Sequence, residues 1–245
     1  MLSRLYDELT PWYRLLDPPE DHAQEAMQVA DLLQESIEPA PRTLLELGAG
    51  AGHNALHLKR RFACTLADIS APMLALSREL NPECEHLTGD MRSLRLGRVF
   101  DAVLVHDAIV HMTSVADLRA AFETSFVHLR PGGAAVFAPD CLRESFREST
   151  ELHERDAGAR SLRCIEWDWD PDPNDDTCMV EYAFPLRAGT RVEAVHDRHV
   201  VGVFGRATWL SLLSEVGFGA STFERALDLE PDSPYTPEVF LARRP

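Results

Sequence analysis

The sequence predicts an α/β fold: a Rossmann-like, doubly wound, mostly parallel seven-stranded sheet with an inserted antiparallel β lid. Three observations support this prediction. Strand-like and helix-like segments alternate between residues 43 and 138, as they do in βαβ units. Glycines at positions 48, 50 and 52 follow the first strand directly. After Pro139, strand-like segments follow one another with turn residues between them, which is typical of an antiparallel meander.

Each expected element of the central part has a local signal. Ser70 is a good N-cap for a helix, with Pro72 in its first turn. The run Pro131-Gly132-Gly133 is expected to end a helix and turn the chain into a strand. In chain order the expected strands are 43–47, 65–68, 85–88, 100–105 and 134–138, and the expected helices are 53–61, 71–79 and 115–129.

We divide the chain into four segments. Residues 1–38 form an N-terminal helical cap, because apolar residues recur there at helical spacing. Residues 39–140 form the ligand-binding core, residues 141–204 the inserted antiparallel β lid that borders the acceptor, and residues 205–245 complete the core sheet.

The last two segments have the following expected elements. In the insert we expect a charged helix at 142–156, followed by strands at 161–170, 178–186 and 191–203. The closing segment is expected to hold a helix at 206–216 and strands near 220–228 and 237–243.

The composition narrows the function classes. The chain has 24 basic and 40 acidic residues, a formal net charge of −16, and it lacks the basic patch that nucleic-acid binding requires. No apolar run reaches the ~18 residues of a membrane span, and the N-terminus lacks the apolar core of a signal peptide. The five cysteines are scattered without a paired motif. We therefore expect a cytoplasmic protein that binds neither nucleic acid nor membranes.

The first chemical signal is the glycine-rich segment after the first strand. Gly48, Ala49 and Gly50 stand between a strand and a helix, where glycine lets the backbone turn tightly and approach a ligand. The spacing is Gly-x-Gly-x-Gly, whereas dinucleotide-binding folds use GxGxxG. Glu46 immediately precedes the glycines. Its negative charge repels a pyrophosphate and attracts an ammonium or sulfonium group.

Polar residues also follow the next three strands. Asp68 ends the second strand roughly 20 residues after the first glycine, and a carboxylate at this place can accept both ribose hydroxyls. Asp90 and Met91 follow the third strand, where they can hold an adenine by its amino group and by its face. Residues 106–112 follow the fourth strand, at the edge where open α/β sheets bind ligands.

Taken in order, these segments resemble the class I S-adenosylmethionine-dependent methyltransferase family. The matching stretches are ELGAGAG, ADISAPML, GDM, FDAVLVHDAIVHM and LRPGG, within residues 40–140. Inside the family the chain is similar to small-molecule enzymes such as the nucleotide-amino-sugar N,N-dimethyltransferases. The residues that carry this similarity are Tyr13, the Ile109–Met112 turn, His199 and Phe204.

The chain departs from that subgroup near the expected acceptor. A glycine is usual where Val110 stands, and serines are usual in place of Asp107 and Ala108. We therefore expect an altered acceptor pocket, which argues against an amino-sugar substrate.

The resemblance implies S-adenosyl-L-methionine as cofactor, with S-adenosyl-L-homocysteine as product, and it implies a binding mode. The glycine backbone faces the methionine part, Asp68 holds the ribose, and His106 lies beside the methionine end. The residues expected to bind the cofactor are Glu46, Gly48, Ala49, Gly50, Asp68, Ile69, Met73, Asp90, Met91 and His106.

Methyl transfer from a sulfonium needs no acid for the leaving group, and it needs a base only if the attacking atom carries a proton. His111, after the fourth strand, is the first candidate for a catalytic base or acceptor-positioning residue. A histidine hydrogen-bonded at a helix start is the alternative. Tyr13 is the second candidate, with packing against Trp12 and Leu16 as the alternative.

Three residues are candidates for the acceptor pocket: Asp107, Arg198 and His199. Strand alternation sends Arg198 and His199 to opposite faces, so we expect one of the two to face the acceptor.

Two further clusters receive no chemical role. The acidic run from Asp168 to Asp176 is interpreted as a solvated hairpin loop. His53 and His57 have the helical spacing of zinc ligands, but Asn54 stands in place of the glutamate that such a motif requires. We therefore expect no metal site.

Two alternatives stay open for the function. An NAD(P)-dependent oxidoreductase or epimerase shares the sheet, the glycines and the ribose acid, but the chain has no Tyr-x-x-x-Lys pair and Lys59 is its sole lysine. A non-catalytic S-adenosylmethionine-binding protein is the other alternative. The partner we expect is a small-molecule acceptor, and the sequence is also compatible with a homodimer.

Overall fold

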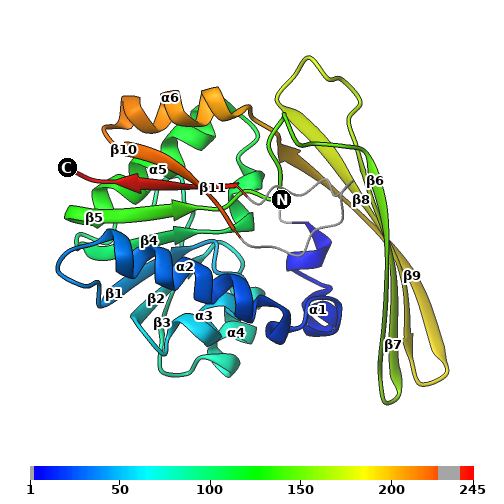
Figure 1. The fold of residues 1–245 in the computed structure, drawn as a ribbon. Helices are drawn as coiled ribbons and strands as arrows, with labels where there is room; N and C mark the ends of the chain where they lie inside the picture. Colours follow the sequence, from blue (N-terminus) through cyan, green and yellow to red (C-terminus); the bar gives the residue numbers. More distant parts are fainter. Residues whose placement is uncertain (1–2, 226–237) are drawn as a thin grey trace.

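The computed structural model describes residues 3–225 and 238–245, which form a seven-stranded core sheet with helices on both faces and a second sheet beside it (Figure 1). The core strands follow in space as β10-β11-β5-β4-β1-β2-β3. They are β1 (Thr43–Leu47), β2 (Ala63–Asp68), β3 (Glu85–Thr88), β4 (Phe100–Val105), β5 (Leu129–Phe137), β10 (Gly219–Glu224) and β11 (Glu238–Arg243). β11 is antiparallel to β5 and β10, and the other pairs are parallel. The predicted, mostly parallel sheet is confirmed.

The helices predicted for the core segments are present in the structure, with differences at their ends. The helix predicted at 206–216 has these bounds in the structure, while β5 begins at Leu129 and so includes the run that the sequence places in a turn. The expected strand residues 226–228 and 237 lie outside the described residues. The helices are α1 (Thr10–Leu16), α2 (Ala23–Ser36), α3 (His53–Leu58), α4 (Ala71–Leu80), α5 (Val115–His128) and α6 (Arg206–Val216), with short 3-10 helices η1 (Arg4–Tyr6), η2 (Pro19–His22) and η3 (Asp107–His111).

Helices cover both faces of the core sheet because neighbouring residues of a strand point to opposite sides. Leu45 of β1 packs in one apolar cluster with Phe122 of α5 and Trp209 of α6. The adjacent Leu44 packs in another cluster, with Leu33 of α2. The buried strands therefore have apolar residues at consecutive positions, as expected for a doubly wound sheet.

The strand order reverses next to β1. From β1 the chain continues to β2 and β3 on one side, and then returns to β4 on the other side. Such a reversal leaves a crevice outside the carboxyl ends of the strands. The polar residues that follow β1, β2 and β4 meet at this crevice.

The insert forms a four-stranded antiparallel sheet in chain order. Its strands are β6 (Ser149–Ala157), β7 (Arg160–Trp169), β8 (Thr177–Ala188) and β9 (Arg191–Gly202). The inserted antiparallel sheet is thus confirmed, but the charged helix predicted at 142–156 is wrong, because most of that segment is β6.

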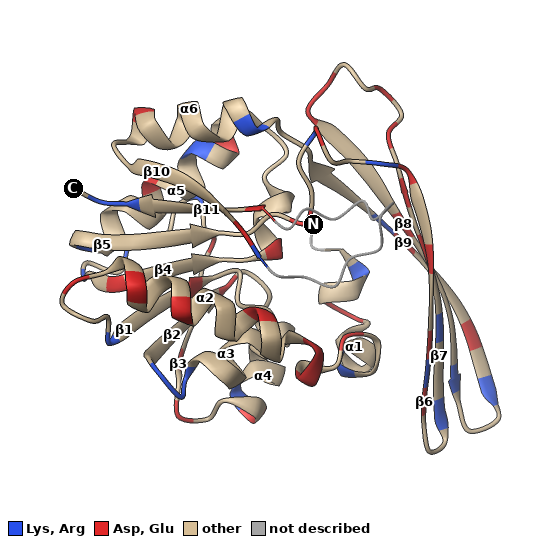
Figure 2. Cartoon of the chain, viewed as in Figure 1, with Lys and Arg blue, Asp and Glu red and all other residues tan. Residues whose placement is uncertain are grey.

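β6 is charged because it is an edge strand with one face in water. Glu154 and Asp156 alternate with residues that point the other way, and both pair with Arg163 on β7. Figure 2 shows charges of both signs along these strands. Charged side chains are common on edge strands because they discourage further strand pairing. The density of charged residues in this segment therefore resembles that of a solvent-exposed helix.

The N-terminal segment, residues 3–22, lies between the two sheets (Figure 1). Leu5 and Leu9 pack against Leu162, Phe184 and Val195 on the inner face of the antiparallel sheet. This segment therefore joins the core to the insert. In the part of the chain that the structure describes, no helix is long and apolar enough to cross a membrane.

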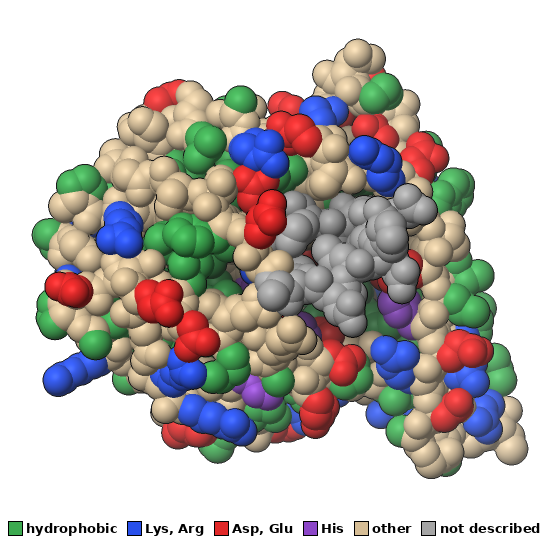
Figure 3. All heavy atoms as spheres, viewed as in Figure 1, with side chains coloured by type: hydrophobic (Ala, Val, Ile, Leu, Met, Phe, Trp, Pro, Cys, Tyr) green, Lys and Arg blue, Asp and Glu red, His purple; other side chains and the backbone are tan. Residues whose placement is uncertain are grey.

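The outer face of the antiparallel sheet has apolar side chains in water. Leu152 of β6 and Ile165 of β7 stand opposite each other across the two strands, and both are exposed. Figure 3 shows apolar side chains along this edge of the molecule.

We expect Phe122→Ala to lower the free energy of unfolding by about 3–5 kcal/mol, the usual cost of a large cavity in a core. The Phe122 ring is fully buried and lies 4.7 Å from the Phe137 ring and 5.4 Å from the Trp209 ring, between centroids. Urea denaturation measures the change. Val127→Ala, at an exposed position of the same helix, is the control and is expected to change it by less than about 0.5 kcal/mol.

Candidate active site

A cavity of about 1040 Å³ lies where the core meets the antiparallel sheet. The glycine-rich loop and the residues after β2 and β4 form one wall, and the inner face of β7, β8 and β9 forms the other. The N-terminal segment lines it as well. All residues that the sequence analysis assigned to cofactor, catalysis or acceptor line this one cavity.

The glycine-rich loop makes its turn with a left-handed backbone. Gly48 has φ of 75°, and a Cβ built on it would lie 2.3 Å from the Cβ of Ala108. The amides of Gly48 and Ala49 donate to the carbonyl of Ala67 at 2.8 and 3.0 Å. Glycine is therefore required at position 48, both for its backbone conformation and for the close approach of η3.

Asp68 fastens this loop to the end of β2. Its Oδ2 accepts a hydrogen bond from the amide of Gly50 at 2.8 Å, and its Oδ1 accepts one from the amide of Ser70 at 2.7 Å. Each carboxylate oxygen retains a further lone pair. The carboxylate borders the cavity, so it can hold the loop and accept ligand hydroxyls at once. The sequence predicted the second task and missed the first.

Glu46 brings an unpartnered negative atom to the cavity. Its side chain is 2% exposed, and its Oε2 has no hydrogen-bond partner among the described residues. Burial raises the pKa of this carboxyl group to about 7. A buried carboxylate oxygen without a partner is costly, and a cationic ligand group would relieve that cost. The site therefore fits the positively charged methionine end of S-adenosylmethionine.

The residues expected around adenine line the cavity, and two of them contact the glycine-rich loop. Met91 reaches toward Gly48, since its Cε lies 2.8 Å from a Cβ built there, and Met73 is buried under the loop. Ile69 is half exposed. Asp90 is already engaged, because the guanidinium of Arg92 donates to both of its oxygens.

His106 is held as a cation between carboxylates. Its Nδ1 lies 2.7 Å from Asp107 and its Nε2 lies 2.8 Å from Glu25. Burial alone lowers the pKa of this imidazole, but the neighbouring carboxylates, with Asp107 first, outweigh burial and raise it to about 9. Arg225 also pairs with Glu25. A protonated His106 is a poor base, so its contribution to the cavity is a fixed positive charge.

Asp107 shares a hydrogen bond with Asp140, a residue that the sequence analysis missed. Burial and then the charge of Asp107 raise the pKa of Asp140 well above its usual range. Burial opposes the ionisation of Asp107, but the positive charge of His106 outweighs it and lowers the Asp107 pKa. Asp140 is therefore the protonated member of the pair, and Asp107 is the ionised one. Asp140 follows the core strand β5, just as Glu46 and Asp68 lie near the ends of β1 and β2. This position was a signal for Asp140 that the sequence offered.

His111, in η3, lies in a cluster of rings that lines the cavity. The centroid of its ring is 5.5 Å from Tyr6 and 5.9 Å from His199. Tyr182 is 5.0 Å from His199. Burial, and next the charge of His199, lower the pKa of His111 to about 4. The imidazole of His111 is therefore neutral near pH 7 and can accept a hydrogen bond.

Tyr13 lies on α1 with its ring centroid 5.6 Å from His53 and 6.1 Å from Tyr6. Burial and the charge of Asp17 raise the pKa of its phenol well above the usual range. Tyr13 therefore stays a phenol, which can orient a ligand but does not take a proton from it.

The structure decides which side of β9 faces the cavity. His199 is buried, and its Nε2 lies 3.1 Å from Asp197, which also accepts the amide of Leu5 at 2.8 Å. The side chain of Arg198 is 57% exposed and pairs with Glu181. The predicted alternation is therefore present, and His199 has the inward orientation of the two.

The sequence analysis also missed two residues on the inner face of β7. Glu166 accepts a hydrogen bond from the hydroxyl of Tyr182 at 2.9 Å and interacts with His153 at 3.0 Å. Asp168 lines the same wall. Assigning Asp168 to a solvated loop is a mistake, because it belongs to β7, whereas Asp172 and Asp175 do bond within an exposed turn. Strand alternation from the buried Cys164 was the available signal.

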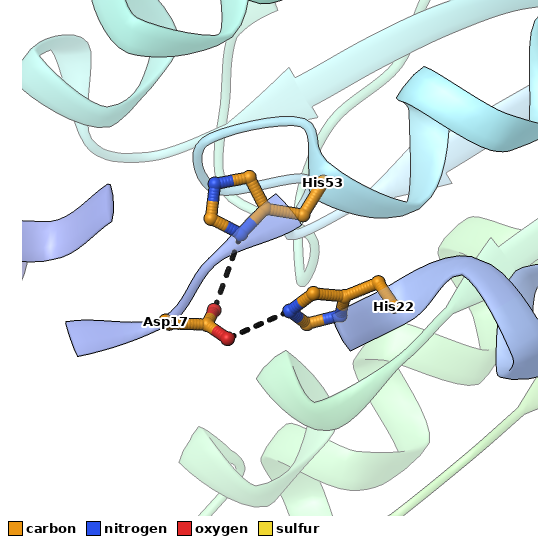
Figure 4. A group of neighbouring side chains, drawn as sticks. All are labelled: Asp17, His22 and His53. Carbon is orange, nitrogen blue, oxygen red and sulfur yellow. Dashed lines mark hydrogen bonds and ion pairs between the residues drawn. The ribbon is translucent and has the colours of Figure 1, made fainter. Parts of the chain in front are cut away.

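Asp17 joins two histidines at the edge of the cavity (Figure 4). Its Oδ1 lies 2.7 Å from His22 and its Oδ2 lies 3.2 Å from His53. His57 instead interacts with the carbonyl of Pro19 at 2.9 Å, so the two helical histidines have different partners. The three side chains are close enough to hold a metal ion. Their hydrogen bonds already pin the N-terminal segment to α3, and the expected lack of a metal stays a prediction.

Comparison with known proteins identifies the family of this chain. The methyltransferase domain family matches residues 44–133. A dTDP-3-amino-3,4,6-trideoxy-α-D-glucopyranose N,N-dimethyltransferase of Streptomyces venezuelae is 33% identical over 211 residues, 83% of this chain and 86% of that protein. The chain belongs to the class I S-adenosylmethionine-dependent methyltransferase family. It is an enzyme that transfers a methyl group to a small-molecule acceptor.

Two further matches agree with this. A dTDP-3-amino-3,6-dideoxy-α-D-glucopyranose N,N-dimethyltransferase of Streptomyces fradiae is 35% identical over 51% of this chain and 50% of that protein. The crystal structure of DesVI from Streptomyces venezuelae superposes with a TM-score of 0.83 and 23% identity, covering 97% of this chain and 98% of that one. At 23% identity, the similarity to DesVI concerns the fold alone.

We expect Asp68→Ala to weaken the binding of S-adenosylhomocysteine by at least about 10-fold, which is about 1.4 kcal/mol. The substitution removes both the expected ribose acceptor and the hydrogen bond that holds Gly50. Calorimetric titration measures the affinity. Asp31→Ala, an exposed carboxylate on α2, is the control. Unchanged affinity in a folded Asp68→Ala protein would rule out the assigned role.

The raised pKa of His106 makes stability depend on pH. The imidazole titrates near 6.5 in the unfolded chain and at about 9 in the folded one. Its contribution is therefore complete below pH 6.5 and is lost as the pH rises to 9. We expect the free energy of unfolding to fall by about 3 kcal/mol more over this range in the parent than in His106→Gln. Equal pH profiles in urea denaturation would contradict the cationic state.

Proposed function

We propose that the enzyme methylates an amino group of its acceptor, in the part of the cavity between η3 and the antiparallel sheet. The observation that carries the proposal is the position of His111, a neutral imidazole in a ring cluster that opens into the same cavity as the glycine-rich loop. The relatives from Streptomyces venezuelae and Streptomyces fradiae bear names of N,N-dimethyltransferases. Their names support nitrogen as the atom that is methylated.

The core wall is the half of the cavity proposed to hold the cofactor. S-adenosylmethionine supplies a methyl group that the positive sulfur has already activated. Glu46 offers its unpartnered oxygen to the cationic end of the ligand, and Asp68 offers its remaining lone pairs to the ribose. The backbone of Gly48 and Gly50 allows close approach, since no Cβ intervenes. The fit of these residues is the basis for assigning the binding roles.

The other wall is proposed to hold the acceptor. After an amine loses a proton to water, its lone pair forms the new N–C bond while the C–S bond breaks and the electron pair stays on sulfur. His111 accepts a hydrogen bond from the remaining N–H and so directs the lone pair at the methyl carbon. Because its pKa is about 4, His111 acts by position rather than by storing the proton. Tyr6, Tyr13 and His199 exclude water around it.

The two remaining expectations about the whole protein stay predictions. A cytoplasmic location agrees with the five cysteines, all of which are free thiols. Homodimer formation is tested by the elution volume of the purified protein on a sizing column.

The test of the proposed function is a pair of measurements. Calorimetric titration with S-adenosylmethionine, S-adenosylhomocysteine and NAD(H) identifies the cofactor, and mass spectrometry of a panel of amine and alcohol acceptors detects methylated products. Selective binding of the sulfur nucleosides with methylated amines is the expected result. Binding without turnover of any acceptor would favour the non-catalytic alternative, and products methylated on oxygen alone would overturn N-methylation.

For His111→Asn we expect kcat/KM for the acceptor to fall by about 10²-fold, in the range of a positioned side chain at a reacting group. The affinity for S-adenosylhomocysteine is expected to stay the same, because His111 faces the other half of the cavity. His196→Asn, on the outer face of β9, serves as the control. A variant that loses cofactor affinity instead would place His111 on the cofactor.

A further inference from the structure

The cavity wall carries an excess of acidic groups. Among the described lining residues, nine side chains are carboxyl groups and three are arginines. Each arginine already pairs with a carboxylate: Arg4 with Glu8, Arg92 with Asp90 and Asp117, and Arg198 with Glu181. The described lining residues therefore offer no uncommitted guanidinium to an anionic ligand.

The positively charged histidines are committed as well. His106 lies between Asp107 and Glu25, His22 pairs with Asp17, and His153, whose pKa is also raised, pairs with Glu166. In sequence, residues 226–237 contain no lysine or arginine, so they add no side-chain cation of their own. Diphosphate sites commonly present arginines, lysines or a free helix N-terminus to the phosphate oxygens.

The acceptor wall crowds several carboxyl groups together. Glu166 and Asp168 project from β7 into the cavity, and Asp140 reaches it from the end of β5. Burial and the charge of Glu166 raise the pKa of Asp168 to about 7. Burial and the charge of Asp107 raise the pKa of Asp140 well above its usual range. A bound cation would relieve this repulsion, whereas a bound anion would increase it.

Aromatic rings complete a site for a cation. Tyr6 lies 5.4 Å from His199, and Tyr182 lies 5.0 Å from it, between ring centroids. The hydroxyl of Tyr182 donates to Glu166, which holds the ring beside the carboxylates. Aromatic faces next to carboxylates attract ammonium groups, because the face of the ring is negative.

We infer that the acceptor is an amine that binds as its ammonium form and carries no phosphate, so that it is not a nucleoside-diphosphate sugar. The inference rests on the proposed methylation of an amine and specifies the class of substrate for that same cavity. It separates this chain from the two relatives, whose names specify dTDP-linked amino sugars. An amino sugar attached to an uncharged aglycone satisfies the chemistry of the wall.

The first test uses thymidine diphosphate alone as a probe and does not depend on turnover. Calorimetric titration of the protein is carried out with and without saturating S-adenosylhomocysteine, at low salt, where electrostatic effects are largest. No saturable binding of thymidine diphosphate at millimolar concentration is the expected result. Saturable binding in the micromolar range would overturn the inference while leaving N-methylation intact.

The second test compares two acceptors that share one amino sugar, linked either to thymidine diphosphate or to a methyl group as a neutral glycoside. We expect kcat/KM to be at least about 10-fold higher for the neutral glycoside, because like charges at a binding site are strongly unfavourable. A preference for the diphosphate would overturn the inference. Lack of S-adenosylhomocysteine binding in the same titrations would count against the proposed function instead.

A variant that lacks two carboxylates tests whether the acceptor wall causes the preference for the neutral glycoside. In Glu166→Gln combined with Asp168→Asn, we expect the preference for the neutral glycoside to shrink by about 10-fold, since two of the repelling groups are gone. Glu154→Gln, an exposed position on the outer face of β6, is the matched control and should keep the parent preference. An unchanged preference in the double variant would show that these carboxylates do not select the acceptor.

Discussion

The carboxylate of Asp68 holds together the corner on which the cofactor half depends. It accepts the amides of Gly50 and Ser70, and so joins the loop after β1 to the turn before α4. Ser70 extends the connection, because its hydroxyl donates to the carbonyl of Tyr6 at 2.6 Å and accepts the amide of Met73. Burial raises the pKa of the Asp68 carboxyl group, and the backbone donors Ser70 and Gly50 offset part of that effect. One side chain thus sets the positions of the loop, a helix and the N-terminal segment.

The N-terminal segment connects the core to the antiparallel sheet. Its Leu5 amide donates to Asp197 on β9, and its apolar side chains pack on the inner face of that sheet. At the other end of the segment, Asp17 joins His53 of α3. The segment is thus fixed both to the core and to the insert, and the aromatic rings of Tyr6 and Tyr13 reach the cavity from it. The two walls keep their relative positions through this short connection.

The sequence was most informative where local patterns decide the structure. Gly205 and Gly217 flank α6, so its bounds were predictable, and the carboxylates at the ends of β1 and β2 were found because parallel strands end at one edge. β6 was missed because the charges of an edge strand imitate a solvated helix. Asp140 and Glu166 each had a local signal in the sequence, but the contacts that give them their roles, with Asp107 and with Tyr182, join segments distant in sequence. His111 was predicted as a candidate, but its neutral state was not, because that state depends on burial and on His199.

The insert leaves the core after β5 and returns to it before α6, and it supplies the cavity wall that we propose faces the acceptor, opposite η3. The residues proposed to bind the cofactor belong to the core, and the insert contains none of them. A change in the four antiparallel strands can therefore alter the choice of acceptor while the methyl donor is bound as before. On this assignment, the residues that would choose the acceptor and those that would bind the methyl donor lie mostly on separate stretches of the chain, so that the two could be changed independently.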